Sequence, residues 1–130
     1  MTTNEVRPFV EAWLAGTDGH QFYTRTYVSS DKPNAAILFL HGFGEHVGRF
    51  EWYHASFAKR GILVFAFDQR GFGRTALDKH HCSEGSAYGN TNWAHQMGDV
   101  EYFLNYLSQQ YPGVPLFLHG ASMVSLGSLF

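Results

Sequence analysis

The chain has 130 residues, 45% of them hydrophobic, and its net charge of −2 excludes the basic surface that nucleic-acid binding needs. Its single cysteine excludes an internal disulfide and is typical of a reducing compartment. The longest apolar runs have six residues, too few for a transmembrane segment, so we expect a cytoplasmic protein, with peripheral contact to membranes or lipid droplets left open.

The first elements in chain order are two short strands. Residues 10–15 form a mostly apolar stretch that ends at the turn-forming residues 16–19. Residues 20–28 alternate with a period of two, which predicts a second strand, antiparallel to the first.

Two continuously apolar runs, residues 35–40 and 62–67, indicate a parallel sheet, because strands covered on both faces have this composition. Between them, residues 49–60 are predicted to form a helix that ends at Gly61. Residues 71–92 are rich in glycine, histidine and serine and are predicted to be an irregular loop. Aromatic residues are expected on the buried side of the helix: Phe50, Trp52, Tyr53 and Phe57.

The clearest helix follows this loop. Apolar residues recur there at spacings of three and four, with Thr91 or Asn92 as the N-cap and Pro112 as the stop. Residues 114–118 are the last predicted strand, and the alternation of strands with helices predicts an α/β fold with a parallel sheet. The expected buried stripe of the helix is Trp93, Met97, Val100, Leu104, Leu107 and Tyr111.

The sequence Gly120-Ala121-Ser122-Met123 directly follows that strand. A strand that runs into Gly-x-Ser is typical of a nucleophile elbow, in which a sharp turn exposes the serine hydroxyl. Small residues at positions 120 and 121 keep such a turn free of clashes. Chance is the alternative in a chain with 14 glycines, but the position after a buried strand favours Ser122 as a nucleophile.

A second glycine motif, His41-Gly42-Phe43-Gly44, follows the strand at residues 35–40. Hydrolases place an oxyanion-hole donor at this point, and Gly42 and Gly44 would let the Phe43 amide face the substrate oxygen. The Met123 amide would be the second donor. The alternative is a glycine turn that only links a strand to a helix.

The loop Asp68-Gln69-Arg70-Gly71 lies at the end of the strand at residues 62–67, where site-forming loops gather. We expect Arg70 to brace this loop through backbone carbonyls or a carboxylate. A phosphate-binding loop is the alternative, but the glycine spacing matches neither of the common phosphate-binding motifs.

Eight histidines raise the hypothesis of a metal site centred on His80-His81-Cys82. Adjacent residues rarely coordinate one ion, and no metal-binding spacing is present, so we expect neither a metal nor a cofactor. His119 lies too close to Ser122 along the chain to act as its base.

Together these motifs resemble the α/β-hydrolase superfamily, and most of all its monoacylglycerol lipase branch with the related lysophospholipases and serine aminopeptidases. The resemblance extends from about Trp13 to Phe130. It implies a mostly parallel sheet with helices on both faces and a lipid-metabolic serine hydrolase. By this resemblance, Ser122 is the nucleophile, the amides of Phe43 and Met123 form the oxyanion hole, and the substrate is a monoacylglycerol or similar lipid ester.

Two features depart from the family pattern. Val124 stands where the family has glycine, and its bulk is expected to distort the elbow. The family's acid, histidine, last strands and lid would follow Phe130, so we expect one partial domain over residues 1–130, truncated after the elbow and inactive as this chain. The alternative is a catalytically dead relative that acts as an interaction module and self-associates through the apolar edge strand at residues 114–118.

Overall fold

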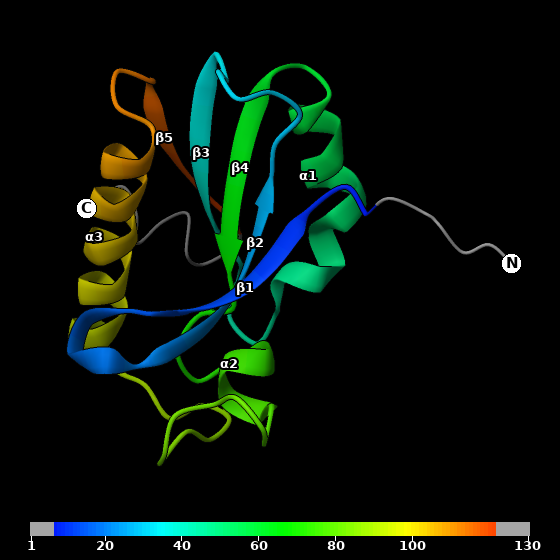
Figure 1. Cartoon of the computed structure of the whole chain (residues 1–130). Helices are drawn as coiled ribbons and strands as arrows, with labels where there is room; N and C mark the ends of the chain where they lie inside the picture. Colours follow the sequence, from blue (N-terminus) through cyan, green and yellow to red (C-terminus); the bar gives the residue numbers. More distant parts are fainter. Residues whose placement is uncertain (1–6, 122–130) are drawn as a thin grey trace, which may run out of the picture.

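The computed structural model describes residues 7–121, which form one sheet with helices on both sides (Figure 1). In chain order the elements are β1 (Val10–Ala15), the 3₁₀ turn η1 (Thr17–Gly19), β2 (Gln21–Tyr27), β3 (Ala35–Leu40), the 3₁₀ turn η2 (Val47–Phe50), α1 (Glu51–Ala58), β4 (Ile62–Phe67), α2 (Gly73–Leu77), α3 (Trp93–Gln110) and β5 (Leu116–Gly120).

The strands of the described sheet follow the order β1-β2-β4-β3-β5. β3 lies between β4 and β5 and runs parallel to both, as the two apolar runs predicted. β2 is antiparallel to β1, which confirms the predicted pairing, and it is also antiparallel to β4. The sheet is therefore mixed, with a parallel core of three strands extended by an antiparallel pair.

Helices cover both faces of the sheet, which confirms that expectation (Figure 1). On one face, Phe103 and Leu107 of α3 pack with Leu38 and Phe65 of the sheet. On the other face, Ala58 of α1 belongs to a second buried cluster that includes residues of β2, β3 and β4. This two-layer cover explains why β3 and β4 are apolar without alternation.

The predicted buried stripe of α1 is wrong in part. The helix buries His54 and Ala58, which are four residues apart and therefore lie on one side of it. Trp52, two positions from His54, points away from the sheet and is 82% exposed. Phe50 and Phe57 do contact the cluster on this face, as partly buried residues.

The predicted stripe of α3 is confirmed at Val100, Leu104, Leu107 and Tyr111, which lie in or against the core, and is wrong at the exposed Trp93 and Met97. The Asn92 side chain accepts a hydrogen bond from the His95 amide and caps the helix, one of the two N-caps expected. The buried side is formed by Asp99, Val100, Phe103 and Leu107. Trp93, at the first turn, is 65% exposed because that turn extends along a cavity and not over the strands.

Two predicted boundaries differ from the structure. Residues 71–92 are not wholly irregular, because the short helix α2 lies within them. The last strand spans Leu116 to Gly120 and not residues 114–118, because its pairing partner is β3, whose register continues to Leu40 opposite Gly120.

Candidate active site

The parallel pairing of β3 with β5 brings the two hydrolase-like motifs to one edge of the sheet. Leu40 is the register partner of Gly120, and the Ala121 amide donates to the Leu40 carbonyl at 3.1 Å. The chain therefore leaves β5 directly beside residues 41–44. The predicted nucleophile Ser122, the donor Met123 and Val124 lie outside the described residues.

Residues 41–44, called the Phe43 loop below, form a tight loop that leaves the Phe43 side chain exposed. Gly44 has a φ of 75°, which favours glycine, and the Glu45 amide donates to the Gly42 carbonyl at 3.1 Å. The Gly42 amide donates in turn to the Glu45 carboxylate at 2.9 Å. Phe43 is 75% exposed, and within residues 7–121 its amide N–H donates no hydrogen bond. Within those residues this amide therefore has no acceptor.

His41 is fully buried and serves as a connector. Its Nδ1 lies 2.8 Å from the Gly42 carbonyl, and its Nε2 accepts a hydrogen bond from the Gln69 amide at 2.9 Å. These partners assign the proton to Nδ1. Burial lowers the pKa of the imidazole, so at neutral pH the ring is uncharged and fixes the start of the loop.

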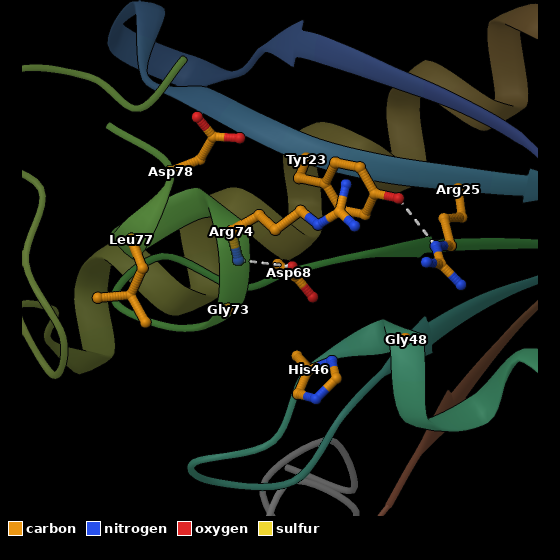
Figure 2. Close-up of a pocket in the computed structure, with 9 residues that line it drawn as sticks. All are labelled: Tyr23, Arg25, His46, Gly48, Asp68, Gly73, Arg74, Leu77 and Asp78. Atoms are coloured by element: carbon orange, nitrogen blue, oxygen red, sulfur yellow. Dashed lines mark hydrogen bonds between the residues drawn. The ribbon is translucent and has the colours of Figure 1, made fainter. Parts of the chain in front are cut away.

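The Asp68 carboxylate joins two further segments. It accepts hydrogen bonds from the amides of Val47, at 2.7 Å, and Arg74, at 2.8 Å. Figure 2 shows the second of these. It therefore caps the first residues of both η2 and α2. Gly73 permits this approach, since a Cβ there would lie 2.4 Å from the carboxylate.

Arg70 braces three segments that are distant in sequence. Its guanidinium donates to both oxygens of the buried Asp99, at 2.8 and 3.0 Å, and to Asp18 at 3.3 and 3.4 Å. The hydrogen bond from Arg70 is the main reason that the pKa of the Asp18 carboxyl is lowered. The sequence analysis missed Asp99, although an acidic residue inside an apolar helical stripe was a signal that it needs a partner.

An apolar cavity of about 410 Å³ opens beside the Phe43 loop. The apolar side chains in its walls come from α3, β3 and β5 and from the loops that carry Phe43 and Phe72. The residues that line it are Leu40, His41, Gly42, Phe43, Gln69, Phe72, Thr91, Asn92, Trp93, Gln96, Met97, Val100 and Leu118.

A second cavity, of about 400 Å³, lies between β2, η2 and α2 (Figure 2). Its walls carry two arginines, but both are already partnered. Arg25 donates to the Tyr23 hydroxyl at 2.9 Å and to Glu51 at 3.2 Å, while Arg74 lies 3.6 Å from Glu11. Because these charges are balanced inside the chain, the second cavity offers little for an anionic ligand.

The histidine-rich segment does not form a metal centre in the part of the chain that the structure describes. Within residues 7–121 no group of three histidine, cysteine, aspartate or glutamate residues could hold an ion. His81 instead contacts the Asp78 carboxylate at 3.1 Å and stacks on Trp13, with ring centres 5.0 Å apart.

Comparison with known proteins finds relatives that match most of the chain. The profile of the family described as serine aminopeptidase, S33, matches residues 31–129, about three quarters of the chain. The chain belongs to this family. Human monoglyceride lipase is 33% identical over 110 residues, which cover 85% of this chain and 34% of the human protein. Monoglyceride lipase of Saccharomyces cerevisiae is 35% identical over 96 residues, covering 72% of this chain and 28% of the yeast protein.

Solved structures of other hydrolases have the same fold. A thermostable carboxyl esterase from Bacillus coagulans, in complex with glycerol, superposes with a TM-score of 0.73 at 28% identity, over 91% of this chain and 37% of the esterase. A soluble variant of Saccharomyces cerevisiae monoglyceride lipase, bound to a substrate analogue, gives 0.72 at 26% identity, over 95% of this chain and 38% of the lipase. This member of the S33 family therefore spans about a third of the length of the relatives it matches.

Proposed function

We propose that this chain supplies the nucleophile and the oxyanion hole of a serine hydrolase that cleaves monoacylglycerols or similar single-chain lipid esters. Ser122 is the proposed nucleophile, and the amides of Phe43 and Met123 are the proposed oxyanion donors. The observation that carries the proposal is the pairing of Leu40 with Gly120, which brings the residue before Ser122 beside the Phe43 loop.

In the proposed reaction, the Ser122 hydroxyl attacks the ester carbonyl, and the two amides stabilise the negative charge that develops on its oxygen. The glycerol alcohol leaves with a proton, and water then hydrolyses the acyl-serine ester. We propose that the base and the acid for these steps come from residues outside 1–130, so that this chain by itself turns over no ester. Each oxyanion donor is typically worth about 10²–10³ in turnover.

The proposed substrate class has two supports. The cavity beside the Phe43 loop has apolar walls of the kind that accept an acyl chain. The family members named above as monoglyceride lipases point to the same class of ester.

No helix within residues 7–121 is both long and apolar enough to cross a bilayer. We place the proposed enzyme in the cytoplasm, at the surface of membranes or lipid droplets where such esters are found.

A fluorophosphonate probe tests this proposal, because it labels only serines that are activated. We would treat the full 130-residue chain with the probe, read the intact mass, and use Ser122→Ala as the control. Labelling that is lost in Ser122→Ala would establish the nucleophile and require that a base reaches it. If the chain is not labelled, the same assay on a polypeptide extended past Phe130 decides the proposal, and absence of Ser122 labelling there would overturn it.

A second candidate function is that of an interaction module without catalysis, whose edge strand β5 pairs with a second copy of the chain. The observation that favours it is the exposure of Phe117, at 58%, on the edge strand of the described sheet. Phe117→Lys should shift the chain towards the monomer in sedimentation velocity. Val10→Lys, a matched change on the opposite edge strand β1, should leave the distribution unchanged. Equal distributions for wild type and Phe117→Lys would reject this candidate.

A further inference from the structure

We propose that Gln69 is a positioning residue for the Phe43 amide, and that it acts through His41. This inference rests on the proposed function, since it concerns one of the two proposed oxyanion donors. Gln69 is not part of either glycine motif and touches no reacting group, but it binds both the backbone and the ring of the residue that begins the Phe43 loop.

Gln69 makes two crossed hydrogen bonds to His41. Its side-chain Nε2 donates to the His41 carbonyl at 2.7 Å, and its backbone amide donates to the His41 Nε2 at 2.9 Å. Both residues are buried, and a buried carbonyl without a donor is costly. β3 ends at Leu40, so the sheet ladder no longer serves His41, and the Gln69 side chain satisfies its carbonyl instead.

Asp68, the residue before Gln69, holds the chain just beyond the Phe43 loop, at Val47. Asp68 accepts a hydrogen bond from the Val47 amide, while Gln69 binds His41. Two consecutive side chains after β4 therefore hold both ends of residues 41–47. Inside this span, the Gly42 amide is bonded to the Glu45 carboxylate and the Glu45 amide to the Gly42 carbonyl. Because hydrogen bonds hold both ends and the interior of this segment, the Phe43 amide is held in one orientation.

This arrangement matters because an oxyanion hole works through donors that are in place before charge develops. A misplacement of about 1 Å at such a site can lower the rate by about 10²-fold. The Gln69 side chain thus takes no direct part in the proposed reaction. Its role is to keep the Phe43 amide aligned. The aromatic contact of Phe43 with Phe72, 5.1 Å between ring centres, steadies the side chain but not the amide.

The test compares the full chain with Gln69→Met, which keeps the length of the side chain and removes its donor. We expect exchange of the Gly42 and Glu45 amides to become about tenfold faster, as for the loss of one buried hydrogen bond. The ¹⁵N spectrum of the His41 ring should change from a single Nδ1–H tautomer to a mixture. Gln69→Glu, which places an acceptor against the His41 carbonyl, should give the larger change in both measurements.

The matched control is Thr24→Val, which removes another buried side-chain donor to a backbone carbonyl, that of Ala12. It should lower stability by a similar amount, yet leave exchange at Gly42 and the His41 ring spectrum as in the wild type. If both measurements are unchanged in Gln69→Met, or change equally in Thr24→Val, the positioning role is wrong.

Labelling of Ser122 by the fluorophosphonate separates this inference from the proposed function. In whichever polypeptide is labelled, Gln69→Met should slow the maximal labelling rate by about tenfold or more while Thr24→Val does not. If no form of the protein is labelled, the proposed function fails, while the exchange and ring measurements still decide whether Gln69 orders the loop. If labelling is normal in a Gln69→Met protein whose loop is disordered, the functional part of the inference is wrong.

Discussion

Two buried histidines, one at the end of the sheet and one on the helix that covers one of its faces, have very different surroundings. At the end of β3, both ring nitrogens of His41 have hydrogen-bond partners, and the ring joins two loops. On α1, His54 is as deeply buried, but in the described part of the chain neither of its ring nitrogens has a partner. Aromatic rings surround it, with the Phe39 ring centre 4.4 Å away and that of Tyr27 at 5.3 Å.

The comparison shows that burial alone does not reveal what a polar residue contributes. His41 specifies a geometry, because displacing it would leave the Gln69 amide and Gly42 carbonyl unpaired. His54 fills space in an aromatic cluster and leaves an unsatisfied polar group there. The loops at the end of the sheet should therefore be sensitive to changes in geometry, and the α1 face should be sensitive to protonation.

The largest effect is expected from Gly73→Ala, which disrupts the hydrogen bonds of Asp68 at the end of the sheet. The new Cβ would lie 2.4 Å from the Asp68 carboxylate, and the φ of 53° is itself unfavourable for alanine. Loss of the two amide bonds to Asp68 together with this strain should lower the free energy of unfolding by about 4 kcal/mol. Urea denaturation measures it. Gly85→Ala, at a similar φ of 83° but in open space, should cost only about 1 kcal/mol.

A smaller loss is expected when the Arg70 brace is broken by Asp99→Asn. The pair is buried, and removing the Asp99 charge leaves Arg70 with only the half-exposed Asp18 as a charged partner, at a cost of about 3 kcal/mol. The double variant Arg70→Met/Asp99→Leu should recover much of that loss, because it removes both charges. Denaturation of the single and double variants in parallel would settle this, and additive losses would contradict the explanation.

Acidification is expected to destabilise the side of the sheet that α1 covers. Burial, followed by the nearby His119 and Arg25, lowers the pKa of His54 from 6.5 to about 4. The unfolded chain then binds more protons between these values, so stability present above pH 6.5 is lost as the pH falls towards 4, by up to about 3 kcal/mol.

The variant His54→Phe should make the stability curve between pH 7 and 4 distinctly flatter, as measured by denaturant midpoints at each pH. His20 and His41, whose pKa values are also lowered by burial, contribute to the slope that remains. A slope in His54→Phe equal to that of the wild type would show that His54 does not titrate in this range.

The smallest effect is expected from Trp52→Ala, on the outer side of α1. Since Trp52 is largely exposed, the change should alter stability by about 0.5 kcal/mol or less. Phe50→Ala, two residues earlier at the end of η2, removes a ring that lies 4.7 Å from that of Phe39 and should cost about 2 kcal/mol. Thermal unfolding of the two variants distinguishes the structure from the sequence-based stripe, which placed both residues inside.

Sequence reasoning located the fold through patterns that are local. The apolar runs of β3 and β4, the cap at Asn92 and the stop after α3 each depend on a few adjacent residues, and the structure confirms them. It also pairs Gly120 with Leu40, the residue before the loop 41–44, while Ser122 stays a prediction because it lies outside the described residues.

Sequence reasoning singled out His41 and Arg70 but missed the distant partners that hold them, Gln69 and Asp99. Gln69 and His41 are 28 positions apart, and Arg70 and Asp99 are 29 apart, so no periodicity links them. A hydrophobicity pattern also cannot place His54 inside, because it classes histidine as polar and chooses the neighbouring Trp52. These residues are recognised only after the sheet has brought their segments together.

The position of β3 between β4 and β5 also affects how the chain folds as it is synthesised. β4 is complete at Phe67, but β5 ends only at Gly120. At about 5–20 residues per second, one side of β3 is without its partner for several seconds. Throughout that interval its backbone can pair with a neighbouring nascent chain. We therefore expect slower translation between these two strands to lengthen the time in which β3 can mispair.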